Sequence, residues 1–494
     1  MRITNGIMLN NNMSNLNANK LRMDEIMTSI ETTKKIQRPS DDPITAVRAL
    51  RLRSTLNEIT QYKDRNVKDA ESWMSATKNA MDKINSALED ILVYCNQGVN
   101  TYQTIDEYNA IITSLKQFRN EVYATGNADY GDRTIFTGYK TDSTLMFTKD
   151  KPDLSYDITE ELSFSDIKNL ERTIGVSRND AYDFAAAPTY VGSSITNETY
   201  HILKLGYDNV DQTAISIQVN GQPLTGVNIT TVSREQSEAT GQSVYRTIGD
   251  NEIRLIPETG EVIFGKNAYQ ALNDTDFSIS YTKTGFKENE LQPEHYFDCV
   301  KRETVAGQVK TTEYTRKDQK INYVVSFNQY LTVNVQGQDI LKHNIGRDVD
   351  EMVGRAEDII AALEKINKLS SELELATNDA DKAKITSMKE AAELELSYAQ
   401  ENLKNSFADG LKLFKEHQQT VTIELSDLGA RMSRLSMIKD RLEQQFLTMD
   451  ELKSKNEDTD IPTAATEYNA MEDVYDASLS VTAKIVQKSL LDFL

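Results

Sequence analysis

Residues 36–81, IQRPSDDPITAVRALRLRSTLNEITQYKDRNVKDAESWMSATKNAM, decide the fold of this chain. The stretch opens with a turn motif that consists of Arg38, Pro39, Ser40, Asp41, Asp42 and Pro43. Each proline disfavours helical φ and ψ angles at the residue before it. Asp42 directly before a proline is typical of a helix N-cap followed by proline at the first helical position. We therefore expect one helix to end near Gln37 and a second helix to begin at Pro43.

The second helix is predicted to be long and to pack against several partners. Apolar or small residues keep an alternating spacing of three and four from Ala49 to Tyr94, and a flanking stripe recurs every seventh residue. The stripe consists of Val67, Met74, Met81, Leu88 and Cys95. Lys63, Asn66 and Thr77 occupy positions within the alternating pattern, which predicts polar contacts that set the register.

Outside this stretch, the chain changes from a helical pattern to a strand pattern in its middle third and then back to a helical pattern. Prolines gather in the middle third, where short alternating or β-branched runs at 215–219, 252–256, 262–264, 277–281 and 331–335 predict strands. Helical patterns cover 105–125, a hairpin at 348–420 that turns at 378–382, and a heptad seam from 425. The predicted fold class is α+β and multidomain: an elongated α-helical coiled-coil stem from the N- and C-terminal segments with an inserted antiparallel β domain.

This organisation predicts five segments. They are an N-terminal assembly helix (1–42), the N-terminal half of the helical stem (43–145), an inserted β-rich outer domain (146–343), the C-terminal half of the stem with a charged helical hairpin (344–455) and a C-terminal assembly helix (456–494).

Both terminal helices carry apolar faces that a monomer has no evident way to bury. The N-terminal face consists of Leu9, Met13, Leu16, Met23 and Met27, on a spacing typical of a two-strand coiled-coil seam. The C-terminal face includes Met471, Tyr475, Leu479, Ile485, Val486 and Phe493. Surface of this kind usually marks an assembly interface. Because the first twenty residues are rich in Asn, a poor helix former, we expect the terminal segments to order on polymerisation.

Four stretches resemble a known family. They are the block at 36–81, NADYGDRTIFTGYKTDSTLMF at 127–147, LTVNVQGQDI at 331–340 and TAKIVQKSLLDFL at 482–494. Together they resemble bacterial flagellin-type axial proteins, and are nearest to the hook-associated proteins of the hook-filament junction. The chain differs from the family in two places. Residues 31–35, ETTKK, replace a small or glycine-containing turn, so the first helix is expected to run on further, and the charged hairpin at about 365–405 is longer than the family leads us to expect.

The resemblance implies a function and a set of partners. It implies an inner helical core made from both termini, a surface-exposed β domain, and export in unfolded form through the flagellar type III apparatus to the extracellular flagellum. It further implies assembly into a homo-oligomeric ring that joins hook to filament. The partners implied are the adjacent hook-associated junction protein, flagellin, and a flagellar export chaperone at the C-terminal region.

Composition restricts other function classes. The 494 residues include 76 Asp and Glu against 55 Lys and Arg, and the formal net charge of -21 makes nucleic acid a poor ligand. No apolar run reaches the length of a membrane span, and the first residues lack the pattern of a cleavable signal, so we expect neither membrane insertion nor signal-peptide secretion. The two cysteines form no disulfide framework or zinc motif.

The sequence offers no catalytic pattern. Its four histidines, His201, His295, His343 and His417, are scattered, and neither a metalloprotease motif nor a phosphate-binding loop occurs. N-capping explains the adjacent Asp41 and Asp42 better than calcium binding does. We therefore predict a structural protein without catalytic, metal or cofactor residues. Two alternatives stay open: flagellin itself, and an adhesin or enzyme carried by the β domain.

Overall fold

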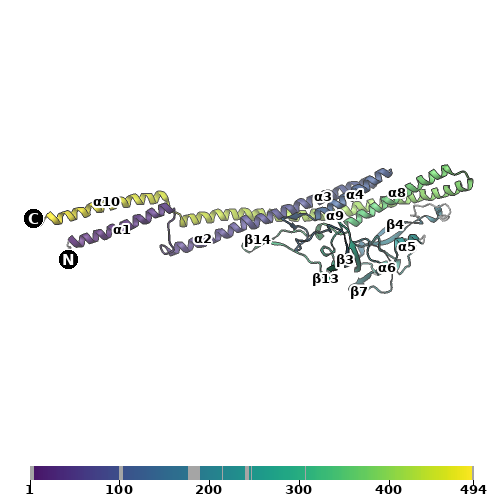
Figure 1. Ribbon diagram of the computed structural model, residues 1–494, viewed down its shortest axis with the longest axis horizontal. Helices are drawn as coiled ribbons and strands as arrows, with labels where there is room; N and C mark the ends of the chain where they lie inside the picture. Colours follow the sequence, from purple (N-terminus) through teal and green to yellow (C-terminus); the bar gives the residue numbers. More distant parts are fainter. Residues whose placement is uncertain are drawn as a thin grey trace. The chain divides into compact units, whose positions relative to one another are not determined.

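The computed structural model describes residues 5–99, 104–175, 190–213, 215–239, 244–245, 248–305 and 308–491. The chain divides into two compact units (Figure 1). We call residues 1–70, 323–331 and 433–494 the helical unit, and residues 71–322 and 332–432 the mixed unit. Each unit therefore combines segments from both halves of the chain, as expected when a β region is inserted between N- and C-terminal helices.

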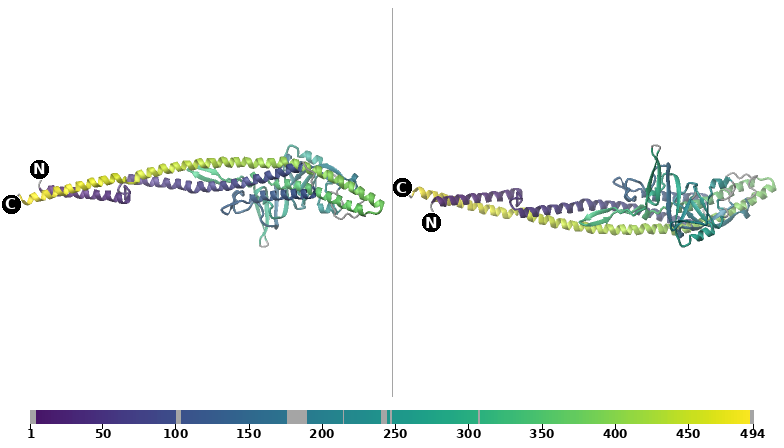
Figure 2. Two further views of the ribbon diagram at one scale, coloured as in Figure 1. Left: turned by 90° about the horizontal axis from the view of Figure 1, so that it is seen from above. Right: turned by 90° about the horizontal axis from the view of Figure 1, so that it is seen from below.

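The helical unit is built from the two ends of the chain. Its N-terminal part contains α1 (Asn5–Thr32), α2 (Pro43–Gln61), a π-helical turn η1 (Tyr62–Asn66) and the start of α3 (Val67–Val99). The end of α9 (Asp379–Glu457) and α10 (Ile461–Leu491) form its C-terminal part. The hairpin of β14 (Asn322–Ser326) and β15 (Gln329–Thr332) contacts η1 and α9 through Asn66 and Arg441. In Figure 1 and Figure 2, α1 lies beside α10 in every view.

The first helix ends earlier than the sequence suggested. We expected it to reach Gln37 or to run on further, but α1 ends at Thr32. Thr33 adopts a positive φ of 58°, which stops the helix, and the next residues pair with the α9–α10 connection instead. The Lys35 amide donates to the Glu457 carbonyl (2.8 Å), and the Thr459 amide donates to the Thr33 carbonyl (3.0 Å). In a longer helix these backbone groups would bond within the helix. Here they form hydrogen bonds between residues 33–35 and residues 457–459.

The second helix begins at Pro43 as predicted, and its core stripe is confirmed. Met74, Met81, Leu88 and Cys95 have no exposed surface, and neither has Val67. The helix is interrupted once, by η1, which contains two of the predicted polar positions. Within the helical unit, Lys63 Nζ lies 3.0 Å from Glu443 Oε2, and Asn66 Nδ2 donates to the Val324 carbonyl (2.7 Å). These polar groups bind specific partners, as register-setting residues should.

The longer helices described in the mixed unit are the remainder of α3, α4 (Ile105–Gly126), α8 (Ile345–Leu375) and the first part of α9. Cys95 of α3 contacts Met352 of α8, with 3.4 Å between the sulfur atoms. The charged hairpin at 365–405 consists of α8 and α9, which are joined at residues 376–378. Its apolar side is covered, because Tyr190 and Ile195 form a core cluster with residues such as Leu369 of α8.

Strands supply the rest of the mixed unit. Across the described residues, a five-stranded sheet has the order β4-β5-β10-β9-β8, a six-stranded sheet has the order β13-β12-β3-β11-β6-β7, and β1 pairs with β2. The strands are β1 (Asp129–Tyr130), β2 (Arg133–Thr134), β3 (Lys151–Ser163), β4 (Lys168–Ile174), β5 (Thr196–Lys204), β6 (Ser216–Val219), β7 (Gln222–Pro223), β8 (Asn228–Thr231), β9 (Glu252–Ile256), β10 (Glu261–Phe264), β11 (Asp276–Phe286), β12 (Asp298–Val305) and β13 (Gln308–Tyr314). Short helices α5 (Arg234–Ala239), α6 (Lys266–Ala271) and α7 (Gly337–Ile340) lie in the connections.

The long pair β3 and β11 is the centre of the six-stranded sheet. The two strands are antiparallel, with Ile158 opposite Tyr281 and Glu160 opposite Ile279, and alternate residues of both are buried. Among the described pairings of the two larger sheets, β8 with β9 is parallel, and the others are antiparallel. The predicted α+β class with an inserted, largely antiparallel β region is confirmed.

Candidate assembly interface

The residues predicted to form the assembly interface lie on α1 and α10 of the helical unit. Helix α1 leads into the joint formed by residues 33–35 and 457–459, and α10 leads out of it, so the two helices are antiparallel. Residues of α1 that face α10 recur at intervals of three and four, as in a coiled-coil seam. The buried or half-buried positions of α1 include Leu9, Asn12, Leu16, Asn19, Met23, Ile26 and Ile30. Those of α10 include Ala464, Tyr468, Met471, Tyr475, Ser478 and Thr482.

This seam corrects part of the sequence interpretation. Leu9, Leu16 and Met23 lie in it, but Met13 and Met27 are exposed beside it. The prediction that these two methionines belong to the two-strand seam is wrong, because Asn12 and Ile26 occupy the corresponding inward positions. Because the prediction was based on apolar residues alone, it chose Met13 in place of the polar Asn12 beside it.

The predicted interface residues of α10 likewise fall partly inside and partly outside the seam. Met471 and Tyr475 lie in the seam, whereas Leu479 is exposed beside it. The side chains of Ile485 and Val486, and the whole of Phe493, lie outside the described residues. Val474 and Val481 add two further exposed apolar side chains to α10. The pair thus uses one face for its own seam and leaves large apolar side chains of both helices uncovered.

Charged groups hold the joint at the base of this pair. Glu457 is almost fully buried and accepts two hydrogen bonds from the Arg53 guanidinium, with Nε at 2.8 Å from Oε1 and Nη2 at 2.5 Å from Oε2. Lys34 pairs with Asp458, and its ammonium group lowers the pKa of that carboxyl. The sequence did not single out these four residues. Their partners lie more than four hundred positions away, so no local pattern signals the cluster.

The turn motif has a local structural role. Asp41 Oδ2 accepts from the backbone amides of Gln37 (3.2 Å) and Arg38 (2.8 Å), which closes the turn. Asp42 caps α2, because its Oδ1 accepts from the amides of Ile44 (3.0 Å) and Thr45 (3.2 Å). Arg38, Pro39, Ser40 and Pro43 are exposed. The two carboxylates are therefore used for backbone capping, in agreement with the preferred interpretation of the motif.

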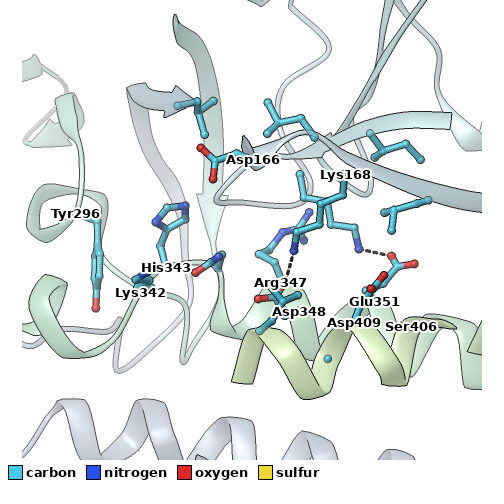
Figure 3. A pocket seen from close by; sticks show the side chains of 18 of the residues that line it. Asp166, Lys168, Tyr296, Lys342, His343, Arg347, Asp348, Glu351, Ser406 and Asp409 are labelled. Carbon is cyan, nitrogen blue, oxygen red and sulfur yellow. Dashed lines mark hydrogen bonds and ion pairs between the residues drawn. The ribbon is translucent and has the colours of Figure 1, made fainter. Parts of the chain in front are cut away.

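The mixed unit contains a cavity of about 330 Å³, lined by β3, β4, β5, the start of α8 and part of α9. Figure 3 shows charged side chains of both signs around it. Lys168 Nζ lies 3.0 Å from Asp348 Oδ1, and Lys204 pairs with Glu351. Burial lowers the pKa of His343 to about 4, so this histidine is neutral at pH 7.

The charged side chains around this cavity pair with one another. Within the part of the chain that the structure describes, we find no hydroxyl or thiol hydrogen-bonded to a histidine there, the pairing that nucleophilic catalysis uses. Among the described residues, no group of three or more His, Cys, Asp or Glu side chains is placed so that it could hold a metal ion. Glu351 instead joins α8 to the five-stranded sheet through Arg172, whose Nη1 lies 2.9 Å away and whose Nη2 also reaches Glu261. These ion pairs therefore attach the five-stranded sheet to α8.

Within the described residues, no helix combines the length and apolar character needed to cross a membrane. Two family descriptions match the ends of the chain. Residues 3–141 match the bacterial flagellin N-terminal helical region, and residues 411–494 match the bacterial flagellin C-terminal helical region. These matches contain α1 and α10, the two helices of the candidate interface.

Individual relatives carry flagellar names. The chain is 26% identical over 147 residues to flagellar hook-associated protein 3 of Salmonella typhimurium, which covers 29% of this chain and 45% of that protein. It is 22% identical over 209 residues to a flagellin of Clostridium tyrobutyricum, which covers 42% of this chain and 54% of the flagellin. The chain thus spans about half the length of these relatives.

A solved structure, flagellar hook-associated protein 3 of Legionella pneumophila, aligns over 82% of this chain and 97% of its own length. Its 11% identity and TM-score of 0.31 are too low to support a further comparison. The likeness therefore rests on the two terminal regions of the chain, which are similar to the helical regions of bacterial flagellins.

Proposed function

We propose that the chain is a structural subunit of the bacterial flagellum that forms the junction between hook and filament by polymerising through its terminal helices. One observation carries the proposal. The α1–α10 pair lies within the two flagellin helical regions, and it leaves apolar side chains of both helices exposed outside its own seam. Exposed apolar surface of this kind usually marks a site where another molecule binds. The hook-associated name of the Salmonella relative favours the junction over other positions.

The proposal includes a set of neighbours. Copies of the chain form a ring, with an adjacent hook-associated protein on one side and flagellin on the other. The chain reaches this extracellular position through the flagellar export apparatus, with a chaperone bound to its C-terminal region. It has no enzymatic activity, and its five predicted segments act as assembly helices, stem and outer domain. Co-purification of the full chain with each neighbour from flagellated cells would test these partners one by one.

Charge substitutions on the exposed flank of α10 test the assembly interface. Val474→Asp and Leu479→Asp place a carboxylate where a neighbour would need apolar contact, and both side chains already lie outside the α1–α10 seam. We expect both variants to fold normally and to fail to assemble on isolated hooks. Asn469→Asp is the matched control, because it adds the same charge at an exposed polar position of the same helix. Assembly of the two flank variants at the wild-type level would contradict the proposal.

The filament subunit is a second candidate, since the longer of the two relative matches is to a flagellin. The two functions differ in what purified protein does on a hook end. A junction subunit stops at a short ring, whereas a filament subunit elongates. Electron microscopy of hooks incubated with the purified chain distinguishes these outcomes directly.

A further inference from the structure

The hairpin β14–β15 presents two aromatic side chains to solvent. Phe327 is 72% exposed and Tyr330 is 62% exposed, and we call these two residues the aromatic tip. Residues 321–338 contain no charged side chain, although 27% of the chain is charged. The hairpin is fixed in place, because Asn66 binds the Val324 carbonyl and Arg441 Nη2 donates to Gln329 Oε1 (2.6 Å). A rigid, uncharged and aromatic protrusion has the composition of an interface anchor.

A second exposed patch lies at the start of α2. Its aliphatic members include Ile44, which is 69% exposed, and Leu50, which is 63% exposed. At about 100° per residue, the patch lies on the side of α2 opposite the buried Ala49 and Leu56. We call this set the α2 patch: Ile44, Val47, Arg48, Leu50 and Arg51.

The two surfaces suit one another chemically. Aliphatic side chains provide the dry contact that Phe and Tyr rings need, and an arginine guanidinium stacks on the face of an aromatic ring. The aromatic tip brings no charge of its own to the contact, and the long side chains of Arg48 and Arg51 can stack on the rings while their guanidinium groups stay at the solvated rim. Among the residues that the structure describes, none covers either surface, since all of these side chains are exposed.

One copy does not bring its own two surfaces together. Tyr330 lies close enough to Tyr62 to raise the pKa of that phenol, after the larger effects of the Glu58 hydrogen bond and burial. Val47 precedes Tyr62 by fifteen residues, about 20 Å along an α-helix. The contacts of Asn66 and Arg441 prevent the hairpin from sliding that far. The aromatic tip and the α2 patch of one copy are therefore too far apart to meet.

We infer that the aromatic tip of one copy docks on the α2 patch of the next copy, as a head-to-tail contact between neighbouring subunits. Two different patches on one subunit make a heterologous interface, which repeats around a ring or along a helix. The inference rests on the proposed assembly function and identifies which surfaces meet. It also gives the exposed start of α2, directly after the turn motif, a role beyond capping.

Disulfide cross-linking tests the contact in the full-length protein. One preparation carries Phe327→Cys and the other carries Leu50→Cys, and equal amounts are assembled on isolated hooks before mild oxidation. Cys95 and Cys299 are buried and do not compete. We expect a cross-linked dimer in the mixed assembly alone. Phe327→Cys mixed with Val93→Cys is the matched control, because Val93 is another exposed apolar residue.

The outcomes distinguish failure of the docking contact from failure of the proposed assembly function. Cross-linking of Phe327→Cys to Leu50→Cys no stronger than in the control would overturn the inference while the proposed function stands. Failure of the wild-type chain to assemble on hooks would overturn both. As an independent measurement, Phe327→Ala should raise the protein concentration needed for assembly about tenfold, as for truncation of an aromatic anchor. An unchanged concentration would also contradict the inference.

Discussion

Asp42 shows how one side chain sets a helix boundary. Its carboxylate accepts from the amides of Ile44 and Thr45 and from the Thr45 hydroxyl, and the hydrogen bonds from Thr45 lower the pKa of Asp42. Pro43 then begins α2 with no amide to satisfy. The sequence was enough to predict this cap because donor and acceptor are neighbours in the chain.

Removal of this cap should have a pH-dependent cost. At pH 7 we expect Asp42→Ala to lower the stability of the helical unit, and Asp42→Asn to lower it less, because Asn caps a helix nearly as well as Asp. A depressed folded-state pKa stabilises the protein above the unfolded-state pKa, and this contribution is lost as the pH falls through the folded-state value. The advantage of Asp42 over Asn should therefore disappear in acid. Urea titrations followed by helical circular dichroism at pH 7 and pH 2.5 measure both effects, and equal stability of the three proteins at pH 7 would contradict the capping role.

Glu160 makes the opposite contribution to pH dependence. Burial raises its pKa to about 7, although it accepts hydrogen bonds from the Tyr281 hydroxyl and the Gly206 amide. A raised pKa means that its stabilising contribution is complete below about 4.5 and is lost as the pH rises through about 7. Relative to Glu160→Gln, the wild type should lose about 3 kcal/mol between pH 4.5 and pH 8.5. Unfolding of the mixed unit can be followed by fluorescence of Trp73, the single and buried tryptophan. A pH-independent difference between the two proteins would show that Glu160 is not the titrating group.

At the scale of elements, the sequence predicted those whose contacts are local or periodic. The start of α2 and the stripe from Val67 to Cys95 follow from capping and heptad spacing. Strand β3 was missed because the charged Glu160 occupies one of its inward positions and hides the alternation. The end of α1 at Thr32 was also missed, since residues near position 458 determine it. The α1 seam was placed incorrectly for a related reason, because Asn12 is polar and faces inward.

The π-helical turn η1 couples two elements in a way that can be tested. Asn66 binds the Val324 carbonyl from this turn and so holds the hairpin β14–β15. In Asn66→Ala we expect the hairpin amides to exchange with solvent about fivefold faster, since a lost hydrogen bond weakens the packing by about 1 kcal/mol. Asn57→Ala, at an exposed position of α2, is the matched control. Equal protection of residues 322–332 in both variants would contradict a holding role for Asn66.

At the scale of the whole molecule, the chain joins its two ends in one unit and inserts the β region in another. The sequence predicted this division from the distribution of prolines and heptads. It did not reveal the ion pairs of Glu457 and Asp458, because they connect positions that only the fold brings together. The candidate interface was likewise predicted as apolar faces, and the structure distinguishes the residues that pack within one chain from those left exposed.

If neighbouring subunits complete the packing of α1 and α10, the amides of these helices should be weakly protected from hydrogen exchange in the monomer. The α1–α10 seam contains Asn12, Asn19, Ser478 and Thr482, so it buries little apolar surface within one chain. We expect amides of residues 5–30 and 465–491 to exchange rapidly in the purified monomer and slowly after assembly on hooks, whereas the core of the mixed unit is protected in both states. Full protection of the terminal segments in the monomer would contradict completion by assembly.

In the proposed junction role, this chain connects the filament to the hook. Electron microscopy of flagella from a strain that lacks the gene tests this role, with the strain complemented by the wild-type gene as control. We expect bare hooks and flagellin released as monomers into the medium, with filaments restored by complementation. Full-length filaments attached to the hooks of the deletion strain would contradict it.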